Sequence, residues 1–296
     1  MSQVLQTGLS IPRASVEEKP ALPWWQAAII SGLLLWVYGP TLAHLVVQWW
    51  NDPNFSHGFF VPLFSAFVIW QERSRLIGAR LQPSWWGLLP LAGGLGLLIV
   101  GHMGAEIFLS RTSLLVVLAG LIVLFLGWGF FRAVLFPWAF LFLMIPIPAI
   151  VFNQITFPLQ LLASKVASTA LSWMGVPVLR EGNVIVLPAM ALEVAEACSG
   201  IRSLMSLLTL AVIYGYLMES KNSVRVLLAV ASIPIAVAAN SFRIVGTGLL
   251  VQYWDPTKAE GFFHEFSGWL IFLISLVMLY LLHRVVLSFT REGAEG

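Results

Sequence analysis

The strongest constraint on the fold is a series of apolar runs that approach or exceed the ~20 residues an α-helix needs to cross a ~30 Å hydrocarbon core. Of the 296 residues, 59% are hydrophobic and only 10% are charged, against about 25% charged residues in an ordinary soluble domain. The mean hydropathy is +0.88. These values exclude a water-soluble globule, a disordered chain, a coiled coil and a nucleic-acid-binding protein. They predict a polytopic membrane protein whose surroundings are the lipid bilayer.

Eight apolar runs predict eight transmembrane helices, so the expected fold class is an all-α membrane bundle. The predicted spans are 24–50, 58–71, 86–102, 107–127, 129–151, 200–218, 226–250 and 265–287. The first run has a pair of tryptophans at each end, as in the aromatic belts of membrane–water interfaces. It is too long for the apolar region of a signal peptide and no small-residue cleavage site follows it, which indicates a retained helix.

One long segment, 152–198, is not expected to span the membrane. Its first half, 153–174, mixes apolar and small polar residues, which suits a helix that lies at the interface or packs on the bundle. Its second half has two β-branched runs, 176–179 and 184–187, on either side of Arg-Glu-Gly-Asn at 180–183. This pattern predicts a β-hairpin just before the sixth helix.

The predicted organisation has five segments. These are a cytoplasmic N-terminal tail (1–23), helices one to five (24–151), an extracytoplasmic or interfacial segment with the hairpin (152–198), helices six to eight (199–287) and a cytoplasmic C-terminal tail (288–296).

The positive-inside rule sets the predicted orientation, with both termini in the cytoplasm. Ten of the sixteen Lys and Arg residues then lie on the cytoplasmic side. These ten are Arg13, Lys19, Arg73, Arg75, Arg80, Arg132, Lys221, Arg225, Arg284 and Arg291. The short loop 72–80 is the strongest indication because it holds three of them. The segment 152–198 and the loop 251–264 then share the outer face.

Polar side chains within or beside predicted spans are candidate site residues, because they are costly in lipid. Cys198 lies at the outer start of the sixth helix, Arg243 in the outer third of the seventh, and His264 opens the eighth. The predicted topology therefore brings a nucleophile, a cation and an acid/base residue to one depth of the membrane.

Such a set suits acyl transfer. A helix N-terminus and a nearby arginine favour the thiolate form of Cys198. The backbone N–H groups of Ser199 and Gly200, together with the Arg243 guanidinium, are placed to stabilise an oxyanion. His264 is suited to donating a proton to the leaving amine and accepting one from the incoming nucleophile. A thioester would join the two half-reactions.

Each of these residues also has a purely structural interpretation. A single cysteine in an apolar chain is commonly a small buried hydrophobe. An arginine near the interface can extend its head group to water, and a histidine at a helix start can be a solvated cap. Arg202, one turn beyond Cys198, either tunes the thiolate or pairs with Glu196, and both interpretations stay open.

Support for metal or cofactor chemistry is weak. Cys198 is the only cysteine, which excludes a disulfide framework and a multi-cysteine metal site. His264-Glu265 is not followed by a histidine three residues later, so the two-histidine zinc helix is absent. We therefore predict no cofactor and no metal. Four histidines that fall toward the outer face leave a scattered metal site as an alternative; they are His44, His57, His102 and His264.

The motifs resemble the exosortase branch of the exosortase/archaeosortase family. The resemblance rests on Glu196-Ala197-Cys198-Ser199-Gly200-Ile201-Arg202, on Asn240-Ser241-Phe242-Arg243 and on His264. It extends over the hairpin at 179–183 and, more loosely, over Ser56-His57-Gly58 with Val61-Pro62. The Cys-Ser-Gly-x-Arg element combined with a downstream Asn-x-x-Arg and His is specific, whereas each part alone is weak.

The resemblance implies a multi-pass cysteine transpeptidase or protease of the bacterial inner membrane, with its site toward the periplasmic face. Its expected partners are exported, membrane-anchored substrates with a C-terminal Pro-Glu-Pro-type signal, a transmembrane helix and a basic tail. It implies that Cys198 is the nucleophile, Arg243 the stabilising cation and His264 the acid/base, with Arg202 and Asn240 supporting.

Ser56 and His57 share the predicted outer face and are expected to line the access path of the substrate. The pattern specifies neither the oligomeric state nor whether water or an amine resolves the thioester. Two rival functions stay open: a non-enzymatic membrane component of envelope polysaccharide export or assembly, and a metal-dependent intramembrane protease.

Overall fold

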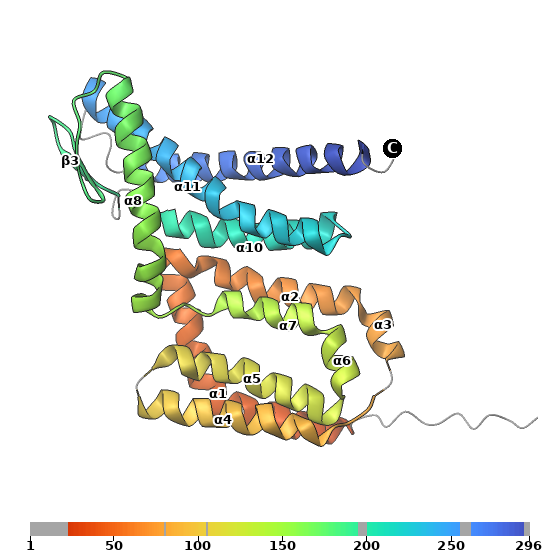
Figure 1. The fold of residues 1–296 in the computed structure, drawn as a ribbon. Coiled ribbons are helices and arrows are strands. Elements are labelled where there is room, and N and C mark those ends of the chain that lie inside the picture. Colours follow the sequence, from red (N-terminus) through yellow and green to blue (C-terminus); the bar gives the residue numbers. More distant parts are fainter. Residues whose placement is uncertain (1–22, 80, 105, 195–199, 255–261, 293–296) are drawn as a thin grey trace, which may run out of the picture.

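The structure is a computed structural model that describes residues 23–79, 81–104, 106–194, 200–254 and 262–292. Within these ranges, five helices are long and apolar enough to cross a membrane. They are α1 (Trp24–Asn51), α4 (Leu88–Met103, with the preceding 3₁₀ turn η2, Trp85–Gly87), α5 (Ile107–Phe125), α11 (Asn222–Tyr253) and α12 (Phe262–Glu292). The protein is therefore an all-α polytopic membrane protein, and Figure 1 shows most of its long helices with roughly parallel axes.

None of the remaining helices qualifies by itself as a span over the described residues, where α10 was compared only over Arg202–Met218. They are η1 (Pro53–Phe59), α2 (Phe60–Gln71), α3 (Arg73–Gly78), α6 (Trp128–Ala133), α7 (Leu135–Phe140), η3 (Leu141–Met144), α8 (Ala149–Trp173) and α10 (Gly200–Met218). A sixth span is reached only if the bent pair formed by 135–144 and α8 is counted as one. The described helices thus give five or six spans by length and composition, where the sequence predicted eight.

The predicted fifth span, 129–151, is the clearest difference. Instead of one helix it contains α6, α7 and η3, and the chain then bends by 86° into α8. Pro146 and Pro148 explain the break, because a proline has no N–H to continue the helix and its ring clashes with the preceding turn. Figure 1 shows α8 lying across the ends of the other helices.

A three-stranded antiparallel sheet follows α8. It consists of β1 (Leu179–Glu181), β2 (Val184–Val186) and β3 (Ala191–Glu193), in the order β1-β2-β3. The turn between β1 and β2 is the two-residue Gly182-Asn183, with Gly182 at φ +64°, rather than the four residues 180–183 expected from the sequence. A tight hairpin turn needs a positive φ, which glycine supplies at little steric cost.

The strand β3 was not predicted, because three residues carry too little alternation to identify a strand. It pairs with β2, so the hairpin is extended into a sheet. The sheet is fixed to α8 by the Ser164 hydroxyl, which donates to the carbonyl of Gly182 at 2.9 Å.

A buried apolar cluster joins the sheet to α8 and to the end of α11. Its members are Ala163, Ala167 and Leu171 from α8, Val176, Ile185, Leu187, Leu192 and Val194 from the sheet region, and Ile244 and Val251 from α11. Because this cluster includes Val251, α11 ends beside the sheet. The sheet and α8 lie at one end of the molecule, and the C-terminal end of α12 lies at the other (Figure 1).

Close approach of α4 and α5 depends on glycines spaced seven residues apart. A Cβ at Gly94 would lie 2.7 Å from the side chain of Val117, and one at Gly101 would lie 2.8 Å from the backbone nitrogen of Ser110. Small residues let helix backbones approach in a bilayer, where packing rather than the hydrophobic effect holds helices together.

We expect Gly94→Ala to destabilise the protein by about 1–3 kcal/mol, because the added methyl overpacks the α4–α5 contact. The adjacent Gly93→Ala is the matched control, since a Cβ there meets nothing within 4 Å. The free energy of unfolding in detergent, measured by chemical denaturation, tests this. Equal values for the two variants would contradict the proposed packing.

Candidate functional site

The helices α10, α11 and α12 pack against one another and carry five of the candidate positions, namely Gly200, Arg202, Asn240, Arg243 and His264. They alternate in direction, so α10 begins, α11 ends and α12 begins at the end of the molecule where the sheet lies (Figure 1). Candidate residues that are far apart in the sequence therefore belong to one end of a three-helix group.

Cys198, Glu196 and Ser199 lie outside the described residues. The described chain on either side of them ends at Val194 and resumes at Gly200, the first residue of α10. Val194 is buried, its N–H donates to the carbonyl of Asn183 at 2.9 Å, and it belongs to the apolar cluster that includes Ile244. The residue before the cysteine segment is thus fixed next to α11.

Arg243 is the best-defined candidate. It lies on α11, ten residues before the end of that helix, or about 15 Å at 1.5 Å per residue. Its side chain is only 7% exposed. Its Nε donates to the hydroxyl of Ser267 on α12 at 3.1 Å. A buried guanidinium needs such polar contacts, because an unpaired charge is costly inside a bundle.

The guanidinium of Arg243 also lies directly over Gly268. A Cβ added at Gly268 would be 3.6 to 3.7 Å from its terminal atoms. Position 264 lies one helical turn before Ser267 and Gly268 on α12, so it falls on the same side of that helix. The side chain of His264 is outside the described part of the structure, but the backbone places its position beside the Arg243 contact.

The predicted supporting residues have different surroundings. Asn240 is buried on α11, three residues before Arg243 and hence on the same side of that helix. Arg202 is exposed on the first turn of α10, and Gly200 begins that helix. The structure therefore brings Asn240 near Arg243 along α11, whereas Arg202 faces outward.

Ser56 and His57 belong to the 3₁₀ turn η1, which packs against α10. Ser56 is exposed, and its hydroxyl donates to the carbonyl of Pro53 at 3.0 Å. His57 is 6% exposed, and its Nε2 donates to the carbonyl of Leu143 at 3.2 Å. The imidazole of His57 is therefore held inside the protein.

A second side-chain hydrogen bond of the same kind reaches the next carbonyl of η3. The indole Nε1 of Trp49 donates to the carbonyl of Met144 at 3.0 Å. Carbonyls at a helix end that is followed by prolines lack the usual backbone donors. Trp49 and His57 supply these donors, so they stabilise the break between η3 and α8.

Burial lowers the pKa of His57, and the carbonyls of Leu143 and Asn54 partly oppose this shift. The neutral imidazole is thus the stable form in the folded protein.

Three of the four histidines proposed for a scattered metal site, His44, His57 and His102, have described side chains. His44 and His102 are exposed, and the Nδ1 of His102 is bonded to the carbonyl of Leu98 at 3.1 Å. Among the described residues, no group of three or more His, Cys, Asp and Glu side chains is close enough to hold a metal ion.

Two polar features were not identified from the sequence. The first is Ser267, one turn after His264, which the motifs did not identify as the partner of Arg243. A buried cluster also links α10 to α12 at the other end of the helices: the Nε2 of His283 lies 2.9 Å from Glu219 Oε1, and its Nδ1 lies 2.7 Å from Tyr214 OH. His283 lies within the predicted span 265–287, and a histidine there is costly without polar partners, so the sequence did contain a sign of this cluster.

Comparison with known proteins gives one match. A family model described as transmembrane exosortase matches residues 49–281. This match includes Cys198, Arg243, His264 and the sheet. No curated protein and no solved structure matches the chain.

We expect Ser267→Ala to destabilise the protein by about 1.5–3 kcal/mol, because it removes a hydrogen bond to a buried charge. Ser275→Ala is the matched control. Ser275 is more deeply buried on α12 than the half-buried Ser267, but its hydroxyl bonds to Ile271 within its own helix, a contact that adds little stability. Denaturation in detergent measures both variants. A loss at Ser275 as large as that at Ser267 would show that the arginine contact is unimportant.

The pKa of His57 predicts a pH dependence of stability. The unfolded state has the higher histidine pKa, so it binds a proton first as the pH falls below about 6.5. Stability from this group is therefore complete above that pH and declines below it. Glutamine does not titrate, so the unfolding free energy of His57→Gln lacks this pH dependence. As the pH is lowered from about 7 to 5, we expect the unfolding free energy of the native protein to decrease relative to that of His57→Gln. Parallel pH profiles would refute this.

Proposed function

Since the chain belongs to the transmembrane exosortase family, we propose that it is a membrane cysteine transpeptidase or protease with Cys198, Arg243 and His264 as its catalytic residues. Its proposed substrates are exported, membrane-anchored proteins that it cleaves at a C-terminal Pro-Glu-Pro-type sorting signal. The reaction would pass through a thioester acyl-enzyme. These proposals follow from the family resemblance of the motifs and from the arrangement of α10, α11 and α12.

The observation that carries the proposal is the hydrogen bond between the buried Arg243 on α11 and Ser267 on α12. It holds a positive charge one helical turn from position 264 and at the sheet end of the molecule. The segment with Cys198 connects Val194, which belongs to the same apolar cluster as Ile244, to Gly200 at the start of α10. The described neighbours of this segment, and the positions of Arg243 and residue 264, support the proposal that cation, acid/base and thiol act in one site.

In the first proposed step, the Cys198 thiolate attacks the carbonyl carbon of the scissile peptide bond. The carbonyl oxygen becomes negatively charged, and the fixed guanidinium of Arg243 stabilises it. The C–N bond then breaks as His264 donates a proton to the leaving amine. The product is a thioester between Cys198 and the new C-terminal carbonyl of the substrate.

In the second proposed step, His264 takes a proton from the incoming nucleophile, which attacks the thioester carbonyl. The C–S bond breaks and the Cys198 thiolate is released. Water as nucleophile gives hydrolysis, and an amine acceptor gives transfer. Asn240, Arg202, Glu196 and the N–H groups of Ser199 and Gly200 are proposed to support this chemistry around the three central residues.

The proposed topology keeps both termini in the cytoplasm and eight membrane crossings in a bacterial inner membrane. The orientation of α8 across the helix ends supports an interfacial position for the segment 152–198 on the outer face. In this arrangement a cleavage signal just outside the substrate helix would reach the depth of Arg243. Ser56 is exposed on η1, so it is proposed to line the access path, with the buried His57 behind it.

The test is co-expression of the full chain with a candidate signal-bearing substrate, followed by mass spectrometry of the membrane fraction. We expect a shortened substrate with the native protein and none with Cys198→Ala. Arg243→Gln should lower processing by about 10²–10³-fold, as loss of an oxyanion-stabilising donor does in other enzymes. Arg284→Gln is the control, because Arg284 is an exposed arginine near the other end of α12.

The mass of the new substrate C-terminus distinguishes hydrolysis from transfer. If genuine substrates stay intact with correctly inserted native protein, the enzymatic proposal is wrong and the non-enzymatic export component takes its place. If processing persists in Cys198→Ala but stops with a chelator, the metal-dependent alternative is favoured instead.

A further inference from the structure

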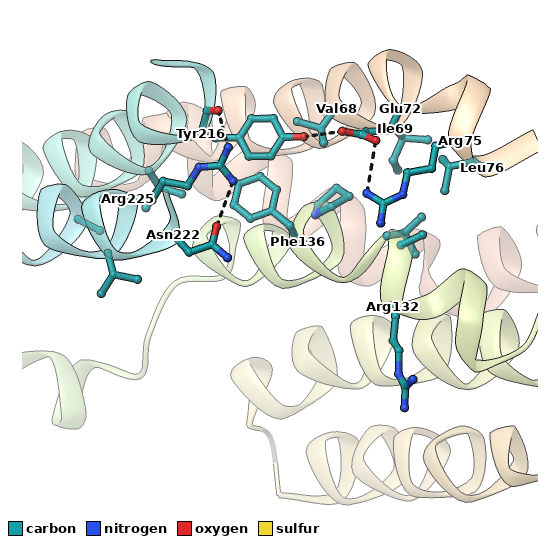
Figure 2. A pocket seen from close by; sticks show the side chains of 16 residues that line it. Val68, Ile69, Glu72, Arg75, Leu76, Arg132, Phe136, Tyr216, Asn222 and Arg225 are labelled. Carbon is teal, nitrogen blue, oxygen red and sulfur yellow. Dashed lines mark hydrogen bonds and ion pairs between the residues drawn. The ribbon is translucent and has the colours of Figure 1, made fainter. Parts of the chain in front are cut away.

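A cavity of about 600 Å³ lies between α2, α7, α10 and α11, at the ends of these helices away from the sheet. Figure 2 shows its polar lining: Glu72, Arg75, Arg132, Tyr216, Asn222 and Arg225. Arg225 lies 18 residues before Arg243 on α11, which is about 27 Å along the helix. The cavity is therefore separate from the proposed catalytic region.

The cavity has a positive electrostatic character. Three arginines and one glutamate line it, a formal charge of +2. The glutamate is already engaged, since Glu72 accepts from the Tyr216 hydroxyl at 3.4 Å and lies 3.8 Å from Arg75. Among the described residues, Arg132 and Arg225 have no carboxylate partner within ion-pair distance. The cavity thus carries positive charge that the described part of the protein does not neutralise.

Arg225 is held in a fixed geometry, which favours a built binding site. Its Nε donates to the carbonyl of Glu219 at 2.7 Å and its Nη2 to the carbonyl of Tyr216 at 3.2 Å. Its guanidinium also stacks on the Tyr216 ring, 4.9 Å from the ring centre. These neutral partners orient the guanidinium without cancelling its charge, as a phosphate site requires.

The rest of the lining is apolar. The walls are formed by Val68 and Ile69 of α2, Phe136 of α7, Val212 of α10, and Val226 and Ala229 of α11. Phe136 stacks on Tyr216 with ring centres 4.4 Å apart. This aromatic pair lines the cavity together with the arginines and the aliphatic side chains. A small hydrophilic anion would leave these walls unused, whereas an acyl chain would fill them.

The position of the cavity matches a membrane–water interface. It lies where α10 ends at Met218 and α11 begins at Asn222. At the same end, the guanidinium of Arg73 lies 4.5 Å from the ring centre of Trp70, which is the kind of aromatic and basic pair found at interfaces. Clusters of basic residues at this level attract anionic lipid head groups.

We propose that this cavity binds an anionic membrane phospholipid. The phosphate lies against Arg225 and Arg75 at the rim, and one acyl chain lies along the apolar walls between α7 and α11. Arg132 also belongs to the lining, but its exposed side chain extends away from Arg75 and Arg225, so the proposed head-group contacts are those two arginines. Bound there, the lipid joins the α2–α7 pair to the α10–α11 pair.

The experiment measures lipid binding to the purified full chain in detergent by native mass spectrometry. We expect phosphatidylglycerol to bind at least tenfold more tightly than phosphatidylcholine. The double variant Arg75→Gln/Arg225→Gln should lose this preference. Arg73→Gln is the matched control, because Arg73 belongs to the same short helix as Arg75 but does not line the cavity.

A second pair of variants tests the acyl-chain part. Ala229→Phe fills the apolar wall and should lower phosphatidylglycerol binding by at least tenfold. Val230→Phe, at the adjacent exposed position outside the cavity, should leave it unchanged. Because both pairs report binding directly, they are independent of the proposed peptide-bond chemistry.

Three outcomes would overturn the proposal. Equal binding of the two lipids would show that the charge is not recognised. If the double arginine variant and Ala229→Phe bind phosphatidylglycerol as tightly as the native protein does, the lipid binds elsewhere. Thermal stabilisation by inorganic phosphate or glycerol phosphate equal to that by phosphatidylglycerol would show that the site takes a free phosphate and not a lipid.

Discussion

A bilayer offers no water to backbone N–H and C=O groups, so each group at membrane depth needs a partner within the protein. The structure meets this constraint at its most irregular point, the break between η3 and α8. Prolines at 146 and 148 remove the donors that a continuing helix would supply, and the side chains of His57 and Trp49 donate to the carbonyls of Leu143 and Met144 instead. This local solution allows the 86° bend, which lets α8 lie across the helix ends and pack against the sheet.

The three C-terminal helices are held together by polar contacts at both ends. Near the sheet, Arg243 of α11 donates to Ser267 of α12. At the other end, His283 of α12 bonds to Glu219 and Tyr214. Polar groups in membrane bundles add modest stability but have specific partners, so they define how helices align. The two contacts together set the depth of position 264 relative to Arg243, on which the proposed chemistry depends.

Tyr216 of α10 likewise joins helices through side-chain contacts, here between the α2–α7 pair and the α10–α11 pair. Its ring stacks on Phe136 of α7 and under the guanidinium of Arg225, and its hydroxyl donates to Glu72 at the end of α2. One side chain of α10 therefore connects α2, α7 and α11. The proposed lipid lies beside this residue, where it would add contacts between α2 and α7 on one side and α10 and α11 on the other.

The sequence by itself determined the membrane class, the all-α fold and the family. Apolar runs and charge are local properties, and the Cys-Ser-Gly-x-Arg, Asn-x-x-Arg and His motifs are read directly from the residues. It also indicated a hairpin, because glycine and β-branched residues determine local backbone geometry. The exact turn and the short strand β3 were missed, because β3 is defined by its hydrogen bonds to β2 and not by its own three residues.

Only the tertiary structure decided how the predicted fifth span is broken, which partner holds Arg243 and where His57 points. Pro146 and Pro148 are local signs of a break within 129–151, but they do not determine the 86° direction in which the chain continues. The outcome depends on donors from Trp49 and His57, about ninety residues earlier in the chain. Likewise, nothing local to Arg243 identifies Ser267, because their contact exists only when α11 packs on α12. Hydrogen bonds between distant segments depend on packing, and a pattern of neighbouring residues carries no information about it.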